Sequence, residues 1–207
     1  MFTFRQFAVD DSMTAMKVGT DGVLLGAWAA GGTRILDIGT GSGLIALMMA
    51  QRFPQALVTA IDIDADACRQ AVANAAASPF GSRITVVNAS LQDFAATAMP
   101  QSFDAIVSNP PYFQNSLLSP DARRTAARHT ASLSFRDLMG GVRRLLADGG
   151  VISVIGPADA ESDMEGEAII SGMSVAATVA VSTRQGKRPR RFMARLVNGP
   201  ATTYDHS

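Results

Sequence analysis

Short apolar runs alternate with amphipathic stretches over the middle of the chain, and this alternation predicts the fold. Strand-like runs rich in β-branched and aliphatic residues lie at 35–38, 58–62, 84–87, 103–107 and 151–155. Helical spacing of apolar residues is found at 44–51, at 64–77 and from the Ser134-x-x-Asp137 capping box to the glycines at 149–150. Strands that alternate with helices in this way form a parallel, doubly wound α/β sheet.

The two ends of the chain depart from this regular pattern. The phenylalanine-rich start predicts a short strand or hairpin, and Thr20 or Asp21 is expected to cap an apolar helix. We expect residues 1–33 to form an extension that packs on a single catalytic domain of residues 34–207.

The last third predicts an acidic helix and two more strands. The helix is expected at 159–170, and the strands at 174–183 and 192–197. A basic loop that contains Pro and Gly joins the two strands at 184–191. If the first of these strands runs parallel to the others, the basic loop lies at the carboxyl edge of the sheet.

Composition limits the classes of protein that this chain can belong to. Its 207 residues, 47% hydrophobic, suffice for one substantial core, and its 18 basic and 18 acidic residues create no global field. One cysteine, Cys68, excludes an internal disulfide framework, and two histidines leave a structural zinc site with few ligands. The N-terminus lacks the pattern of a signal peptide, and no apolar run approaches the ~20 residues of a membrane span. We therefore expect a cytoplasmic protein without metal or membrane partners.

A glycine-rich turn follows the first predicted strand of the sheet. Gly39, Gly41 and Gly43 lie at the carboxyl end of that strand, where doubly wound sheets bind ligands. Glycines let the backbone approach a ligand closely, and the next helix offers free N–H groups. Asp62 ends the second strand, where an acidic residue can accept both hydroxyls of a ribose. Asp62 can alternatively serve as a charge at a helix N-terminus, a role better suited to Asp64 and Asp66.

The sequence Asn109-Pro110-Pro111-Tyr112 follows the fourth strand and carries the candidate chemistry. The Asn109 amide oxygen and the Pro110 carbonyl are two fixed acceptors for one NH₂ group, because the prolines stiffen the chain. Tyr112 offers a flat face for stacking a planar substrate. The same four residues can also form a proline-stiffened turn without function.

Taken together, these motifs resemble those of class I S-adenosylmethionine-dependent methyltransferases that modify amino groups. Within that class, the stretch from Met16 to Trp28 is similar to the start of the bacterial tRNA(Val) adenine-N6 methyltransferase family. The Ala127-Arg128-His129 stretch and the 186–191 loop are similar to the same family. The resemblance implies a Rossmann-like, seven-stranded, mostly parallel sheet with an antiparallel C-terminal strand. It also implies methylation of adenosine 37, on the 3′ side of the anticodon, in tRNA(Val).

The resemblance implies S-adenosylmethionine as cofactor and S-adenosylhomocysteine as product. It assigns Asp37, Gly39, Gly41 and Gly43 to the methionine end of the cofactor and Asp62 to its ribose. Further cofactor contacts are expected from Lys17, Thr20, Thr40, Ile63 and Asn109.

One position departs from the family pattern. The family usually has an acid two residues after the third strand for the adenine of the cofactor, and this chain has Ser90 there. Either Asp93 replaces that acid, or the Leu91 backbone holds the adenine alone.

The implied reaction needs two acceptors and an RNA-binding surface. By accepting the two N–H groups of adenine N6, Asn109 and the Pro110 carbonyl make its lone pair more available, while Tyr112 stacks on the flipped base. Arginines and one lysine are expected to contact the tRNA: Arg123, Arg124, Arg128, Lys187, Arg188, Arg190 and Arg191.

Other functions remain compatible with the motifs. A glutamine-N5 protein methyltransferase uses the same four-residue motif, but its family has a larger helical domain before the glycine turn. Another rRNA or DNA amino-methyltransferase and a non-catalytic RNA-binding scaffold are further alternatives. The sequence does not fix the tRNA, the nucleotide or the oligomeric state, and it is compatible with a monomer.

Overall fold

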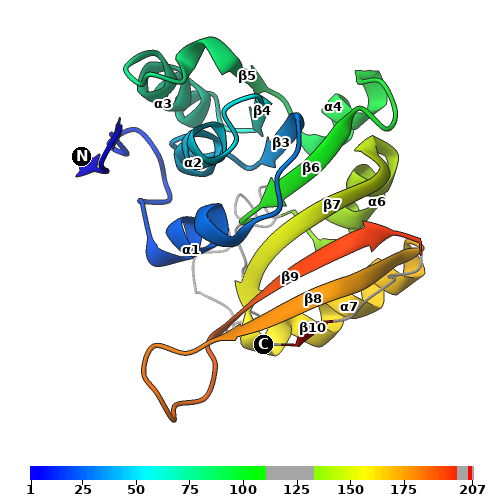
Figure 1. The fold of residues 1–207 in the computed structure, drawn as a ribbon. Coiled ribbons are helices and arrows are strands. Elements are labelled where there is room, and N and C mark those ends of the chain that lie inside the picture. The colour runs from blue at the N-terminus through cyan, green and yellow to red at the C-terminus, as the bar shows by residue number, and fades with distance from the viewer. Residues whose placement is uncertain (111–132, 200–204, 207) are drawn as a thin grey trace, which may run out of the picture.

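A computed structural model describes residues 1–110, 133–199 and 205–206, and it has the predicted α/β fold (Figure 1). The strands of the main sheet are β3 (Arg34–Ile38), β4 (Leu57–Asp62), β5 (Ile84–Asn88), β6 (Phe103–Ser108), β7 (Leu146–Pro157), β8 (Met173–Val181), β9 (Arg191–Asn198) and β10 (Asp205–His206). The helices are α1 (Thr20–Trp28), α2 (Leu44–Arg52), α3 (Ala65–Ala76), α4 (Leu91–Thr97), α6 (Phe135–Leu145) and α7 (Glu161–Ile170). Short 3₁₀ turns, η1 (Gly81–Arg83) and η2 (Ala158–Ala160), and a small hairpin of β1 (Phe2–Thr3) and β2 (Ala8–Val9) complete the described elements.

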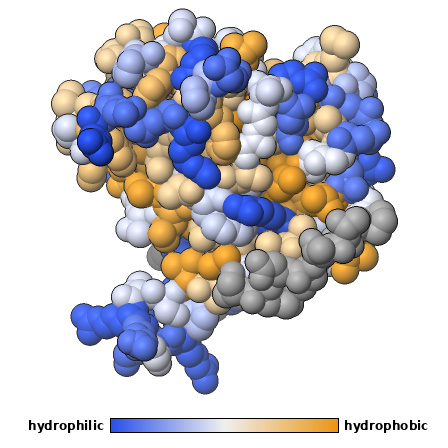
Figure 2. All heavy atoms as spheres, in the orientation of Figure 1, coloured by the Kyte–Doolittle hydropathy of each residue, from blue (hydrophilic) through white to orange (hydrophobic). Residues whose placement is uncertain are grey.

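The main sheet has the strand order β10-β8-β9-β7-β6-β3-β4-β5. Strands β3 to β7 pair in parallel, whereas β9 is antiparallel to both of its neighbours, β7 and β8. The predicted seven-stranded sheet with one antiparallel C-terminal strand is thus confirmed, with the two-residue β10 added beside β8. Because β8 runs in the direction of β7, the loop after it projects from the carboxyl edge of the sheet, as predicted (Figures 1 and 2).

Successive side chains of the strands point to opposite faces of the sheet and pack in two apolar layers, one on each face. On one face Leu36 and Ile106 pack with residues of α4, α6 and α7. On the other face Ile35 and Val107 pack with residues of α1 and α2. Burial on both faces explains why these strands read as nearly continuous apolar runs in the sequence.

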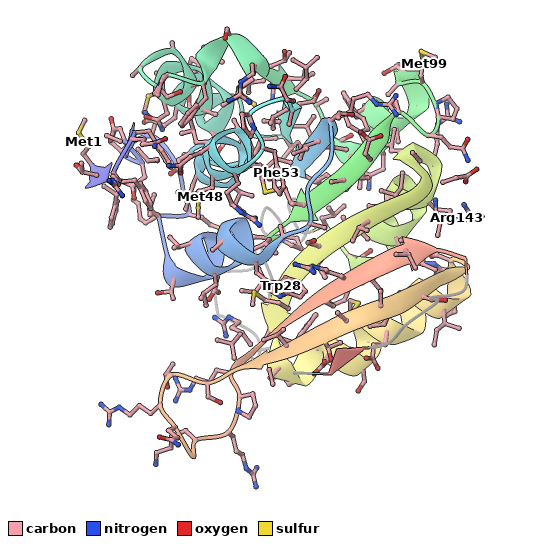
Figure 3. The ribbon with its side chains drawn as sticks, in the orientation of Figure 1. Met1, Trp28, Met48, Phe53, Met99 and Arg143 are labelled. Carbon is pink, nitrogen blue, oxygen red and sulfur yellow. The ribbon has the colours of Figure 1, made fainter. Side chains whose placement is uncertain are left out.

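Helix α1 is held at its C-terminal end by two arginines. The Arg52 guanidinium on α2 donates hydrogen bonds to the carbonyl oxygens of Gly26 (2.8 Å) and Ala29 (3.0 Å). Arg195 on β9 donates to the Trp28 carbonyl and lies over the Trp28 ring, with 4.2 Å from its Cζ to the ring centroid. Trp28, the last residue of α1, therefore contacts the sheet through Arg195 of β9 (Figure 3). Cations at the carbonyl end of a helix also stabilise its dipole.

Three local predictions need correction. Helix α4 was not predicted, because seven residues are too few to establish a helical period, although the Ser90-x-x-Asp93 pattern marks its start. Helix α6 ends at Leu145, before the predicted glycines, because Leu146 already pairs with Phe103 as part of β7. The N-cap of α1 is Gly19, and neither Thr20 nor Asp21 caps the helix.

Asp104 ties the start of β6 to the start of β3, at the sheet edge opposite the candidate site. Its carboxylate accepts hydrogen bonds from the Thr33 hydroxyl (2.6 Å) and amide, and pairs with the Arg34 guanidinium at 2.8 Å. Partial burial opposes ionisation, but the donors from Arg34 and Thr33 outweigh it and hold the pKa of Asp104 well below its usual range. This carboxylate therefore stabilises the fold above about pH 4, and the contribution is lost as the pH falls towards the lowered pKa.

We predict that Asp104→Asn lowers the free energy of unfolding by about 1–2 kcal/mol at pH 7, since it removes the charged partner of Arg34. Urea unfolding at pH 7 and at several values below pH 4 measures the effect, and the difference from the parent should shrink in acid. Asp148→Asn, which alters a single bond from Gln101, is the control and should change stability by less than about 0.5 kcal/mol. An equal loss at every pH would contradict an ionic role for Asp104.

Candidate functional site

The carboxyl ends of β3, β4 and β6 bring the predicted motifs to one edge of the sheet. Ile38 pairs with Ser108 in the register of the sheet, and the Ser108 hydroxyl donates to the Ile38 carbonyl at 3.0 Å. Gly39 and Asn109, the residues that follow, therefore leave the sheet side by side. Asp62 ends β4 on the other side of β3.

The glycine turn is held in place by hydrogen bonds to β4, while the space beside two of its glycines is free of other described residues. The amides of Gly39 and Thr40 donate to the Ile61 carbonyl (2.9 and 3.0 Å), and the Gly41 amide donates to Asp62 Oδ2 (2.8 Å). Gly39 and Gly41 have left-handed φ values of +72° and +55°, which other residues rarely adopt. A Cβ placed on either glycine would meet no atom of the described residues within 4 Å. The turn thus presents bare backbone to open space, as a cradle for a ligand requires.

Asp37 is completely buried beneath this turn. Its Oδ2 accepts hydrogen bonds from the Thr40 hydroxyl (2.7 Å) and the Ala46 amide (3.0 Å), so it caps α2, whose N-cap Gly43 has no side chain. Its Oδ1 has no hydrogen-bond partner among the described residues. Burial, with a smaller contribution from the charge of Asp62, raises the pKa of Asp37 from 3.8 to about 7, against the Thr40 and Ala46 bonds. An unpaired buried carboxylate oxygen calls for a cationic or N–H ligand.

Asp62 holds the next turn along the edge. Its Oδ1 accepts the Asp64 amide at 2.9 Å, while its Oδ2 accepts the Gly41 amide, and each oxygen keeps a further acceptor position. Capping of α3 falls to Asp64, whose side chain accepts the amides of Asp66 and Ala67, as the sequence indicated. The Ile63 side chain, next to Asp62, is 59% exposed.

Asn88 contributes to this turn and was missed from the sequence. Its Nδ2 donates to the carbonyls of Asp62 (2.9 Å) and Ile63 (3.1 Å), so it fixes the turn from β5. Its place directly after the predicted strand 84–87 is the sequence signal that could have identified it.

The structure gives Ser90, Asp93 and Leu91 roles in α4. Ser90 is the N-cap: its hydroxyl accepts the Asp93 amide (3.0 Å) and donates to Asp93 Oδ2 (2.7 Å). The Leu91 side chain is buried in the core. A cofactor role for this turn stays a prediction.

Lys17 and Thr20, two further predicted cofactor contacts, lie at the entrance to α1. Lys17 Nζ donates to the carbonyls of Asp11 (2.7 Å) and Thr14 (3.0 Å) and so closes the loop that precedes α1. Thr20 is the exposed first residue of that helix. Their predicted contact with the cofactor stays untested.

The described part of the predicted catalytic motif consists of Asn109 and Pro110. Asn109 is half-buried and Pro110 is buried directly after β6. Tyr112 lies outside the described residues, as do three predicted RNA contacts: Arg123, Arg124 and Arg128.

The basic loop predicted at 184–191 comprises residues 182–190, between β8 and β9. It projects beyond the body of the protein and is strongly hydrophilic (Figure 2). A hollow of about 600 Å³ on it is lined by Thr183, Arg184, Lys187, Arg188 and Arg190. Among the described residues, no carboxylate pairs with these four cations. Arg191 differs, because its Nε donates to Asp21 Oδ2 on α1 at 2.8 Å and anchors the base of the loop.

Two other features limit the range of sites. In the described ranges, no three His, Cys, Asp or Glu side chains are grouped so as to bind a metal ion. No helix in those ranges is both long and apolar enough to span a membrane.

A mostly apolar groove of about 550 Å³ lies between α3 and β5, lined by Ala65, Cys68, Arg69, Val72, Val86 and Asn88.

A sheet with a glycine turn, an aspartate at the end of the neighbouring strand and an Asn-Pro turn on one edge is typical of a methyltransferase. The chain belongs to the methyltransferase small domain family, which matches residues 12–155. Its fold resembles that of a predicted O-methyltransferase from Agrobacterium tumefaciens, with a TM-score of 0.65 at 21% identity over 90% of this chain and 85% of that one.

Within this class the chain belongs to the tRNA1(Val) (adenine(37)-N6)-methyltransferase family. It is 50% identical over 194 residues to the protein of that name from Phocaeicola vulgatus, a match that covers 93% of this chain and 81% of the relative. It is 45% identical over 201 residues to the protein of that name from Aeromonas hydrophila, covering 96% and 84% respectively.

The raised pKa of Asp37 predicts how stability depends on pH without a ligand. The ionised form is disfavoured in the folded state, so the parent loses stability as the pH rises from about 4 to about 7. Asp37→Asn keeps the acceptor for Thr40 and Ala46 but removes the charge. We expect the Tm of the variant to rise relative to that of the parent across this pH range. Each kcal/mol of difference in unfolding free energy should correspond to about 2–4 °C in Tm. Above pH 8 the difference in Tm should be constant. A difference in Tm that does not change with pH would show that Asp37 is not held with a raised pKa.

Proposed function

We propose that this protein transfers a methyl group from S-adenosylmethionine to N6 of an adenine in tRNA, and that the target is adenosine 37 of tRNA1(Val). The observation that carries the proposal is the pairing of Ile38 with Ser108, which sets the glycine turn beside Asn109. A cofactor held at the turn then lies next to a base held at Asn109. The names of relatives at 45–50% identity support the choice of substrate.

The residues of the edge fit S-adenosylmethionine. The unpaired Asp37 Oδ1 is suited to the ammonium group of its methionine part, and the bare backbone at Gly39 and Gly41 admits a ligand at close range. Asp62 retains acceptor positions for ribose hydroxyls, and exposed Ile63 offers an apolar surface to the adenine ring. When bound, the cofactor supplies an electrophilic methyl group on a sulfonium centre.

Asn109 and Pro110 are proposed to prepare the amine of the substrate. The lone pair of adenine N6 is delocalised into the ring, which makes this nitrogen a poor nucleophile. If Asn109 Oδ1 and the Pro110 carbonyl each accept one N–H, the nitrogen is drawn towards tetrahedral geometry and its lone pair becomes available. Both acceptors are fixed directly after β6, so they stabilise developing positive charge without reorganising. We propose Tyr112 as the stacking surface for the flipped base.

The basic loop is proposed to hold the RNA backbone. Lys187, Arg188 and Arg190, with Arg184 as an addition to the predicted set, surround one hollow at the edge of the sheet that carries Asn109. Clustered cations suit phosphates. Arg191 pairs with Asp21 and so fixes the loop on α1, and we propose that it also contacts the RNA. A substrate of this kind implies a cytoplasmic location.

The decisive experiment supplies the protein with methyl-labelled S-adenosylmethionine and unmodified tRNA1(Val), followed by nucleoside analysis. We expect label in N6-methyladenosine at position 37. A parallel reaction contains a release factor as the candidate protein substrate. Label in the protein and none in the tRNA would replace the proposal with glutamine methylation.

Asn109→Ala should reduce turnover by about 10²–10³, the usual effect of removing one preorganised electrostatic contact. Affinity for S-adenosylhomocysteine, measured by calorimetry, should hardly change, because the glycine turn and Asp62 are intact. Asn109→Asp keeps a carbonyl-type acceptor and should retain more activity than Asn109→Ala. Methylation at the parent rate by Asn109→Ala would contradict the two-acceptor mechanism.

Replacing Lys187, Arg188 and Arg190 by Ser should weaken tRNA binding and lower its salt dependence by about one unit of slope for each lost phosphate contact. Binding titrations at several salt concentrations measure the slope. Arg143→Ala, which removes an exposed cation from α6 far from the loop (Figure 3), is the matched control and should leave the slope unchanged. An unchanged slope in the triple variant would exclude the loop from the RNA-binding surface.

A further inference from the structure

Asn74 on α3 is a buried amide whose hydrogen bonds reach two distant parts of the chain. Its Oδ1 accepts the Asp10 amide at 3.0 Å, and its Nδ2 donates to the Asp10 carbonyl at 2.7 Å. The same Nδ2 donates to the Ser42 carbonyl of the glycine turn at 2.8 Å. Both N–H groups of the amide are therefore used, one on each side.

The glycine turn that Asn74 contacts is closely packed against its neighbours. The turn lies directly against α3, since a Cβ placed on Gly43 would lie 3.2 Å from Ala71 Cβ. Other contacts of the turn run to β4: the Gly39 and Thr40 amides bind the Ile61 carbonyl. Asn74 thus connects the turn to α3 and to the N-terminal segment by hydrogen bonds.

The N-terminal segment in turn fixes the Asn74 side chain. The Asp10 backbone amide donates to the Asn74 side chain and the Asp10 carbonyl accepts from it, as two backbones pair in a sheet. One helical turn earlier on α3, Gln70 Oε1 accepts the Met13 amide at 3.2 Å and the Ser12 hydroxyl at 3.3 Å. Gln70 therefore binds the same segment without reaching the glycine turn.

We propose that Asn74 is a positioning residue for the cofactor: it sets the Ser42 carbonyl, and with it the open backbone of the glycine turn, against the N-terminal segment. The inference rests on the assignment of this turn to the cofactor under the proposed function. Since linkage is reciprocal, a ligand that stabilises the turn also stabilises the bond between Asn74 and Asp10.

The test compares Asn74→Ala with Gln70→Ala, which removes a buried amide from the same helix and the same segment. We expect Asn74→Ala to weaken binding of S-adenosylhomocysteine about tenfold, the scale of one buried hydrogen bond. Gln70→Ala should lower the Tm but change the affinity by less than about twofold. Equal affinities in the parent and Asn74→Ala, with a lower Tm alone, would reduce Asn74 to a structural residue.

Hydrogen exchange of the unmodified protein tests the same link without a variant. Saturating S-adenosylhomocysteine should slow exchange of the Asp10 amide, and an unchanged rate would overturn the proposal. Asn74→Asp, which keeps the size of the side chain but removes both donors, replaces Asn74→Ala if that variant fails to fold. A parent protein that does not bind S-adenosylhomocysteine at all would instead overturn the assignment of the turn to the cofactor.

Discussion

A buried carboxylate, Asp37, sets the geometry on which the candidate site depends. It supplies the cap that the glycine at the start of α2 cannot provide, and it holds Thr40 in the middle of the turn. Burying a charge with one unpaired oxygen is unfavourable for the free protein, as the raised pKa indicates. The arrangement becomes favourable when a cation reaches that oxygen. Among the described residues Asp37 Oδ1 is thus a buried acceptor without a partner, and we propose that the ammonium group of S-adenosylmethionine binds there.

The same edge of the sheet combines the three tasks of the proposed reaction. The register of β3 with β6 sets the cofactor turn beside the amine acceptors, and the direction of β8 brings the basic loop to that edge. Helix α1 is connected to the basic loop, because Arg191 at the base of the loop pairs with Asp21 in the first turn of the helix. The N-terminal segment before α1 reaches the glycine turn through Asn74. Residues 1–33 are in this sense part of the site.

The parts that were predicted correctly follow from local signals, whereas most of those that were missed depend on contacts between distant residues or on a signal that is too short. The strands, the glycine turn and the capping roles of Ser134 and Asp64 follow from apolar runs and short-range patterns. Asn74 contacts a residue 64 positions away and Arg191 one 170 positions away, so neither contact has a signature in its own neighbourhood. The sequence therefore indicated the charge of Arg191 but not its pairing with Asp21. Helix α4 is too short for its period to be recognised.

We propose that the cofactor binds across the glycine turn with its ammonium group on Asp37 and its ribose on Asp62. A crystal structure of the protein with S-adenosylhomocysteine tests this claim most directly. We predict an N–O distance within hydrogen-bonding range between the ammonium and Asp37 Oδ1, and ribose hydroxyls on the Asp62 carboxylate. A ligand found in the groove between α3 and β5, or one that leaves Asp37 Oδ1 without a partner, would contradict it.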